Sequence, residues 1–252
     1  MPKLLWNLYA LCYDRIVELL PYQEMLDEVV TALDLSPGMR VLDAGCGTGA
    51  LAERLAAKHP DIELVAADLS PSMLKRARAR RDWPASFKFV EGNIDDVLAG
   101  DERGFDRIAS VNVIWTLPDP QRTFALMTAR LREGGRMVHT TPSWRFRAPA
   151  IVWRHIHGHR GWARLRSLLG LPVLALAGLL NLFLLAQSML LARAPRASKR
   201  WHADGLAELL RAAGAPPRAV QPCYAGQDVL LVCEKEESNA CATRLPVPGE
   251  HL

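Results

Sequence analysis

Residues 41–49, Val-Leu-Asp-Ala-Gly-Cys-Gly-Thr-Gly, constrain the fold more than any other stretch of the chain. An apolar run ends in an acid, Asp43, and a turn with glycines at positions 45, 47 and 49 follows. Glycines are needed where the backbone turns sharply and approaches a ligand closely, because a Cβ atom would block both. A helix-forming segment, residues 50–58, comes directly after the turn. The stretch therefore predicts a strand, a ligand-binding turn and a helix, as at the start of an α/β domain.

A second buried strand, predicted over residues 64–68, also ends in an acid. This acid, Asp68, lies 19 residues after Gly49, close to the ~20 residues expected for a carboxylate that binds ribose hydroxyls at the end of a second strand. The glycine spacing is G-x-G-x-G, and Asp43, two residues before the first glycine, would repel the pyrophosphate of a dinucleotide. An acid there suits a cationic amino-acid and sulfonium group, which favours S-adenosylmethionine over NAD.

The pattern D-x-G-x-G-x-G, followed by Asp68-Leu69-Ser70-Pro71-Ser72-Met73-Leu74, closely resembles the class I S-adenosylmethionine-dependent methyltransferases. Further segments resemble the remaining core elements of that family in the correct order: residues 87–94, 105–112, 121–132, 133–138, 205–214 and 228–235. The resemblance implies an α/β fold: a Rossmann-like, doubly wound, mostly parallel seven-stranded sheet. It also implies helices on both faces of the sheet and a helical lid insertion after strand five.

The resemblance assigns cofactor contacts to individual residues. Asp43 would meet the amino-acid part of S-adenosylmethionine, and Asp68 would accept hydrogen bonds from both ribose hydroxyls. Asn93 stands where family members often have Asp, although an amide can still hydrogen-bond the adenine edge. The other expected cofactor-binding residues contribute backbone contacts in the turn, adenine packing or closure of the methionine side: Gly45, Cys46, Gly47, Leu69, Met73, Ile94 and Asn112.

Methyl transfer is an in-line displacement, so the protein mainly positions the two reactants and excludes water. Neither covalent catalysis nor a metal is required, and we expect no metal site. A general base helps only if the acceptor is an oxygen or carbon acid of high pKa. The candidates for such a base are His139, after strand five, His202, before the last helix, and Tyr13, in the N-terminal segment. A purely structural role is the alternative for each.

Charge and cysteine content narrow the functional class of the protein. The formal charge of +4 is modest and does not indicate a nucleic-acid binder. Five cysteines without metal-ligand spacing, and an N-terminus without signal-peptide architecture, favour a reduced, cytoplasmic setting.

The sequence also divides into four predicted regions. They are an N-terminal helical cap over 1–35, a cofactor-binding core over 36–143 and 200–235, an insertion over 144–199 and a disordered tail over 236–252.

The insertion departs from the rest of the core. Residues 151–166 are basic and rich in Trp and His, and residues 167–192 contain no ionisable side chain. Hydropathy alone indicates a membrane span, but a single crossing would separate the last helix and strand from their own sheet. Two interpretations remain open. Residues 151–192 could contact the membrane peripherally, at its inner face, or they could form a buried lid or a homodimer element.

An apolar lid implies an apolar substrate, because pockets are lined to match what they bury. The sequence therefore predicts methyl transfer from S-adenosylmethionine to a hydrophobic small molecule or lipid-like acceptor, of the quinone, isoprenoid, polyketide or phospholipid class. The alternative is a relative of the same fold that uses the bound cofactor for a non-methylating reaction, such as cyclisation or another group transfer. A non-catalytic, membrane-bound regulatory partner is a third hypothesis, which the intact cofactor signature disfavours.

Overall fold

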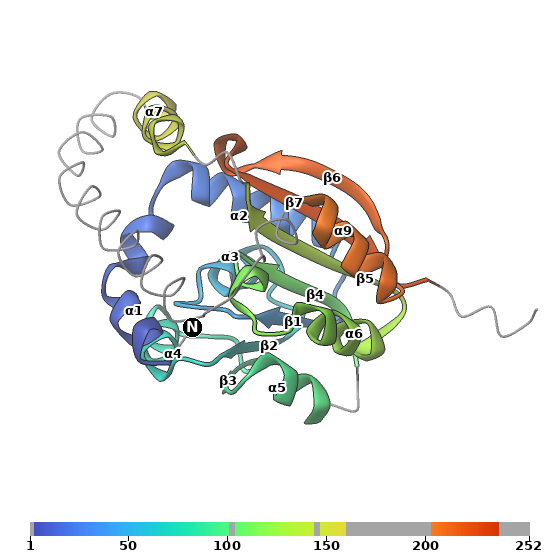
Figure 1. Ribbon diagram of the computed structural model, residues 1–252. Helices are drawn as coiled ribbons and strands as arrows, with labels where there is room; N and C mark the ends of the chain where they lie inside the picture. Colours follow the sequence, from blue (N-terminus) through green and yellow to red (C-terminus); the bar gives the residue numbers. More distant parts are fainter. Residues whose placement is uncertain (1–2, 101–103, 144–146, 160–202, 237–252) are drawn as a thin grey trace, which may run out of the picture.

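The computed structural model describes residues 3–100, 104–143, 147–159 and 203–236 (Figure 1). In these ranges the strands form one seven-stranded sheet with the order β3-β2-β1-β4-β5-β7-β6. Strands β1 to β5 run parallel to one another, whereas β7 lies between β5 and β6 and runs antiparallel to both. The strand bounds are β1 Arg40–Ala44, β2 Glu63–Asp68, β3 Phe87–Glu91, β4 Phe105–Val111, β5 Leu131–Pro142, β6 Pro217–Cys223 and β7 Asp228–Glu234.

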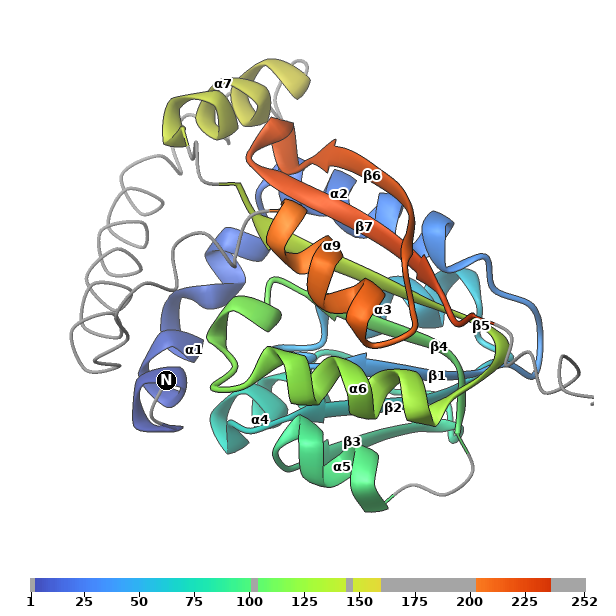
Figure 2. The ribbon, with the colours of Figure 1, turned by 45° about the vertical axis from the view of Figure 1, so that its right-hand side comes forward.

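Helices cover both faces of the sheet. Figure 2 shows α5, α6 and α9 in front of the strands, with α2 and α3 behind them. The bounds are α1 Lys3–Val17, α2 Leu20–Leu33, α3 Ala50–Lys58, α4 Pro71–Ala79, α5 Ile94–Gly100, α6 Pro120–Arg130, α7 Ala148–Gly158 and α9 Ala203–Ala212, with 3-10 turns η1 Ile114–Thr116 and η3 Tyr224–Gly226. The predicted doubly wound, Rossmann-like sheet is therefore confirmed.

The central strands are buried on both faces, which explains their continuous apolar runs. All five residues of β1 are buried, and successive side chains enter opposite layers. Val41 joins the core under α2 and α3, whereas Leu42 joins the core under α5, α6 and α9. This two-sided burial fixes the sheet, so the loops at the carboxyl ends of β1, β2 and β4 share one edge.

Helix α2 is closed by a buried arginine from the sheet. The side chain of Arg107, in β4, donates from Nε to the Leu33 carbonyl (2.6 Å) and from Nη2 to the Asp34 carbonyl (3.1 Å). These carbonyls lie at the end of the helix, where intrahelical donors run out. The arginine thereby holds the end of α2 against the sheet.

The predicted element boundaries need several adjustments. The predicted cap over 1–35 consists of two helices, α1 and α2, separated at residues 18–19. The helix predicted over 121–132 ends at Arg130, because β5 already begins at Leu131. Strand β6 was not located in the sequence, since Pro217 and Pro222 bracket it and most of its residues are exposed.

Most of the predicted insertion lies outside the described residues, as does almost all of the predicted tail. The described part of the insertion is α7, which packs on the junction of α1 and α2. There the Leu20 N–H donates to Nδ1 of His155 (3.1 Å), and Arg154 pairs with Glu24. Within the described ranges, no helix combines the length and the apolar character that a bilayer crossing needs.

Candidate functional site

The glycine turn joins β1 to α3 at the carboxyl edge of the sheet. Its three glycines all have positive φ values: 83° at Gly45, 54° at Gly47 and 81° at Gly49. The N–H groups of Gly45 and Cys46 donate to the Ala67 carbonyl of β2 (2.8 and 2.9 Å). The turn is thus folded across the end of the neighbouring strand, with its backbone held close to the sheet edge.

Space around the turn is as restrictive as its backbone conformation. A Cβ atom at Gly45 would lie 2.4 Å from Cγ2 of Val113, which follows β4. A Cβ at Gly47 would lie 3.2 Å from the ring of Tyr13 in α1. The turn is therefore enclosed on one side by the β4 loop and on another by the N-terminal helix.

Asp68, at the end of β2, organises the turn. One carboxylate oxygen accepts from the Gly47 N–H (2.9 Å) and the other accepts from the Ser70 N–H (2.8 Å). Burial raises the pKa of Asp68, and these two hydrogen bonds act in the opposite direction. Each oxygen keeps a further lone pair, so the carboxylate can also accept two hydroxyls of a ligand.

Asp43, at the base of the turn, is an almost fully buried carboxyl that is 1 % exposed. Its Oδ2 atom has no hydrogen-bond partner among the described residues. Burial, and then the nearby charge of Asp68, raise the pKa of Asp43 to about 7. An uncompensated buried carboxylate is costly, which indicates that this edge of the sheet is built to receive a hydrogen-bonding or cationic ligand.

The third part of the edge is a polar group after β4. Asn112 has a positive φ of 56°, and its N–H donates to Oγ1 and to the carbonyl of Thr140 in β5. Its Nδ2 donates to Oδ2 of Asp228, the first residue of β7, at 2.7 Å. Burial raises the pKa of Asp228 to about 6, although the bond to Asn112 opposes this.

Three tyrosines form an aromatic row beside the turn. The hydroxyls of Tyr13 and Tyr22 are hydrogen-bonded at 2.8 Å, and the rings of Tyr22 and Tyr224 meet edge to face with centroids 5.8 Å apart. Burial, followed by the charges of Asp68 and Asp43, raises the pKa of Tyr13 to about 12. Tyr13 is therefore a protonated hydroxyl near both carboxylates at neutral pH.

The residues predicted to surround an adenine lie at the ends of β2 and β3. Leu69 is 40 % exposed, and the side chain of Asn93 accepts from the Asp95 N–H at the start of α5. Ile94 and Met73 are buried. Cys46 is also buried, which raises the pKa of its thiol, so the thiol is not poised as a nucleophile.

His139 lies within β5, directly before Thr140, and not after the strand as predicted. Its ring is buried against Phe124 in α6. Neither ring nitrogen has a partner among the described residues, and burial lowers the pKa of His139 to about 3. His202, the second histidine candidate, lies outside the described residues.

Asp228, Thr140, Tyr22 and Tyr224 belong to this edge but were not identified from the sequence. The one available signal was the acid that opens the last apolar strand, residues 228–235. Placing Asp228 beside Asn112 requires knowing that β7 runs antiparallel next to β5, with Asp228 opposite Pro142. The hydrogen bond between Asn112 and Asp228 joins residues 116 positions apart in the chain.

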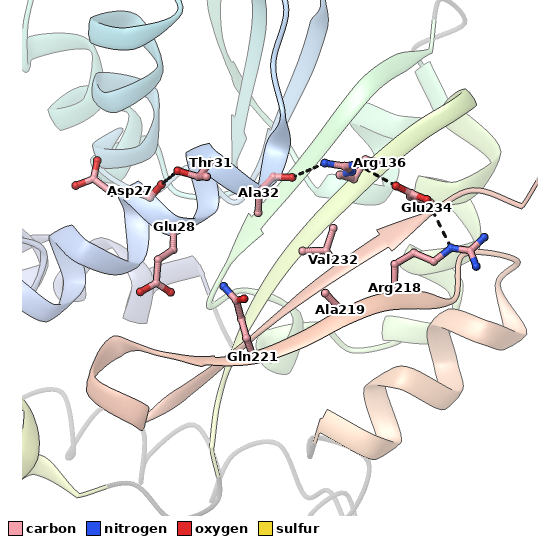
Figure 3. Close-up of a pocket in the computed structure, with 10 residues that line it drawn as sticks. All are labelled: Asp27, Glu28, Thr31, Ala32, Arg136, Arg218, Ala219, Gln221, Val232 and Glu234. Atoms are coloured by element: carbon pink, nitrogen blue, oxygen red, sulfur yellow. Dashed lines mark hydrogen bonds and ion pairs between the residues drawn. The ribbon is translucent and has the colours of Figure 1, made fainter.

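A separate hollow of about 570 Å³ lies between α2 and the β5-β7-β6 part of the sheet (Figure 3). In this hollow Arg136 and Arg218 both pair with Glu234 (3.0 and 3.5 Å). It is not lined by any part of the glycine turn. Within the described ranges, no group of three or more His, Cys, Asp or Glu side chains is arranged to hold a metal ion.

Fold and site together define a Rossmann-like α/β domain with an acidic, glycine-rich ligand turn at its sheet edge. Residues 41–135 match the family model described as "Methyltransferase domain". The resemblance of this part of the chain to the class I S-adenosylmethionine-dependent methyltransferases is therefore confirmed.

Curated relatives match part of the chain. This chain is 33 % identical over 118 residues to the biotin biosynthesis bifunctional protein BioCD of Bordetella avium, and the match covers 47 % of this chain and 25 % of that protein. It is 30 % identical over 141 residues to a ubiquinone biosynthesis O-methyltransferase of Xanthomonas oryzae pv. oryzae, covering 56 % of each. The chain thus matches between a quarter and just over half the length of these relatives.

Solved structures share the fold at low sequence identity. The N-methyltransferase NodS of Bradyrhizobium japonicum, in complex with S-adenosyl-L-homocysteine, superposes with a TM-score of 0.58 at 16 % identity, covering 88 % of this chain and 91 % of that one. The [4+2]-cyclase SpnF superposes with a TM-score of 0.57 at 16 % identity, covering 85 % and 80 %. These likenesses establish the fold, which is shared by proteins of different chemistry.

The crowded turn predicts a specific stability difference between two glycine substitutions. Gly45 and Gly38 have similar positive φ values, 83° and 78°, but nothing lies within 4 Å of a Cβ at Gly38. Gly38→Ala should therefore cost only the backbone strain, about 1 kcal/mol. Gly45→Ala should cost about 2 kcal/mol more, because the β-branched Val113 side chain cannot move away freely. Urea unfolding measures both, and equal losses would show that the contact with Val113 is unimportant.

Asp43 predicts how the stability of the ligand-free protein changes with pH. Its folded pKa, about 7, lies above the ordinary value of 3.8, so the folded state holds the proton more tightly and loses stability as pH rises through 7. Between pH 6 and pH 8 this loss should be about 1 kcal/mol. Urea unfolding at both pH values should show a smaller loss for Asp43→Asn and an unchanged loss for the exposed control Asp61→Asn. An unchanged loss in Asp43→Asn would mean that Asp43 has an ordinary pKa.

Proposed function

We propose that the chain is an enzyme that transfers a methyl group from S-adenosyl-L-methionine to a hydrophobic small molecule or lipid-like acceptor. The observation that carries the proposal is the glycine turn with a buried carboxyl, Asp43, and a half-buried one, Asp68, at the carboxyl edge of the sheet. The match of residues 41–135 to the methyltransferase domain family supports the same reaction.

The described residues fit the cofactor. Asp68 keeps lone pairs for the two ribose hydroxyls, and the unpartnered Asp43 Oδ2 is available to the cationic amino-acid end, directly or through water. The backbone at Gly45, Cys46 and Gly47 allows the close approach that a Cβ would block. Leu69, Met73, Asn93 and Ile94 would surround the adenine, and Asn112 would close the methionine side. When bound, S-adenosylmethionine supplies a methyl group already activated by the sulfonium.

The protein's own contribution is to enclose and orient the two reactants. Tyr13 lies against Gly47 and joins the aromatic row with Tyr22 and Tyr224, so the turn has an aromatic wall on its N-terminal side. Since Tyr13 holds its proton well above neutral pH, its hydroxyl would act as a hydrogen-bond donor toward an acceptor rather than as a base. Tyr13 is thus our remaining described candidate from the three predicted catalytic residues, and His202 stays a proposal.

An apolar acceptor agrees with the surface where the insertion begins. On α7, Trp153 is 66 % exposed and Val152 is 38 % exposed. The Xanthomonas relative is a ubiquinone biosynthesis O-methyltransferase, which supports the quinone class among the acceptors considered. We further propose a cytoplasmic protein whose residues 151–192 contact the inner face of the membrane peripherally, or else cover the site as a lid or homodimer element. We expect no nucleic-acid partner.

A non-methylating reaction at the same site is the second candidate. The specific observation that favours it is the structural likeness to the [4+2]-cyclase SpnF, since one fold supports several chemistries. The products separate the two candidates, because only a methyltransferase releases S-adenosylhomocysteine in proportion to product.

The test uses the full chain and S-adenosylmethionine labelled in the methyl group. We expect mass spectrometry to find a labelled product in the lipid-soluble fraction of an extract of the source organism, together with an equal amount of S-adenosylhomocysteine. Asp68→Asn should weaken S-adenosylmethionine binding at least about tenfold, since it removes charge-assisted hydrogen bonds. The control Asp61→Asn should match the unmodified protein. Cofactor binding without a labelled product would contradict the methyltransferase assignment and favour the non-methylating alternative.

A further inference from the structure

Three carboxylates lie at strand ends along the edge of the sheet that holds the glycine turn. Asp43 and Asp68 lie in β1 and β2, and the antiparallel course of β7 brings Asp228 to the same edge. Asp43 is 1 % exposed and Asp228 is 2 % exposed. Among the described residues, no Lys, Arg or His side chain pairs with any of the three or shifts its pKa. Arg80, a described cation at the turn, donates to the carbonyl and hydroxyl of Thr48 and pairs with Asp14 and Glu53 instead.

Such an arrangement points to a positively charged ligand. Burial of anionic groups without a counter-charge costs free energy, and Asp43 Oδ2 is fully buried without a hydrogen-bond partner in the described ranges. The row of Tyr13, Tyr22 and Tyr224 lies beside the carboxylates, and aromatic rings also favour cations. Carboxylates and aromatic rings together suit a compact organic cation.

Asp228 occupies a particular place in this arrangement. It is bonded to Asn112, and the next residue, Val113, touches the position that a Cβ at Gly45 would take. The pKa values of Tyr224 and Cys223 are raised mainly by burial and secondly by the charge of Asp228. Asp228 therefore contacts Asn112, after β4, on one side and lies near Tyr224 and Cys223 on the other.

We propose that Asp228 recognises the positive charge at the reacting end of the cofactor, so that the protein binds S-adenosylmethionine more tightly than S-adenosylhomocysteine. This inference rests on the proposed function. The sulfonium becomes a neutral thioether when its methyl group leaves, and only the substrate form then gains from a nearby carboxylate. Asp228 would thereby favour entry of the methyl donor and release of the spent cofactor.

Calorimetry of the two cofactor forms at pH 7.5 tests the proposal without an acceptor. The unmodified chain should bind S-adenosylmethionine about tenfold more tightly than S-adenosylhomocysteine, as expected for one charge-assisted interaction. Asp228→Asn keeps an oxygen that can accept from Asn112 but removes the charge. It should bring the two affinities within about twofold of each other, mainly by weakening S-adenosylmethionine binding. Asp61→Asn, an exposed control, should keep the preference.

Other results would overturn the proposal. If Asp228 has a merely structural role, Asp228→Asn would weaken the binding of both cofactor forms equally. If Asp228 has no role in binding, the tenfold ratio of affinities would stay unchanged in Asp228→Asn. Failure of the unmodified chain to bind either form would instead overturn the proposed function itself. Thermal unfolding of each variant identifies one that fails to fold.

A pH series on the unmodified chain gives a second test that needs no variant. Protonation of Asp228 between pH 7.5 and pH 5.5 should reduce the preference for S-adenosylmethionine toward equality. The groups next to Asp228 are Asn112, Tyr224 and Cys223, which remain uncharged in this range. The other carboxyls with raised pKa are Asp43, Asp68 and Glu28, which lies near Cys223. Comparison with Asp43→Asn and Glu28→Gln separates the shares of Asp43 and Glu28. A constant ratio across the range would contradict the role of Asp228.

Discussion

The two hydrogen bonds that Asp68 accepts, from the Gly47 and Ser70 N–H groups, hold the site in place. They fix the turn after β1 to the end of β2, while the Ala67 carbonyl accepts the N–H groups of Gly45 and Cys46. Because these bonds use the sheet itself as a template, the turn keeps its left-handed glycine conformations without a ligand. The surrounding elements depend on this arrangement: Val113 fills the space beside Gly45, and Tyr13 lies against Gly47.

The same edge concentrates negative charge, and this gives the site its chemical character. Asp43, Asp68 and Asp228 come from different strands, and the described residues offer none of them a basic partner. The domain therefore carries unbalanced carboxylates where a cofactor with an ammonium and a sulfonium group would bind. Burial raises the pKa values of Asp43 and Asp228, and a positively charged ligand would supply the compensating charge and lower both pKa values again.

Local patterns explain what could be predicted from the sequence. The glycine turn and the acid at the end of β2 are local sequence patterns, and the strands follow one another in a recognisable order. The doubly wound sheet and the positions of Asp43 and Asp68 could therefore be predicted. Contacts between distant segments were not accessible in this way. Asp228 reaches Asn112 because β7 pairs antiparallel with β5. Strand β6 could not be predicted, because it contains two prolines and most of its residues are exposed. The sequence also did not show that β5 continues past residue 138, so that His139 lies within the strand with its ring against Phe124 of α6.

The most direct test is a crystal structure of the protein with S-adenosylhomocysteine bound. The account predicts both ribose hydroxyls within hydrogen-bond distance of the Asp68 carboxylate, and the homocysteine part between the glycine turn and Asn112. Ligand density in the hollow between α2 and β6, or an empty glycine turn at saturating ligand, would contradict the assignment of this edge as the cofactor site.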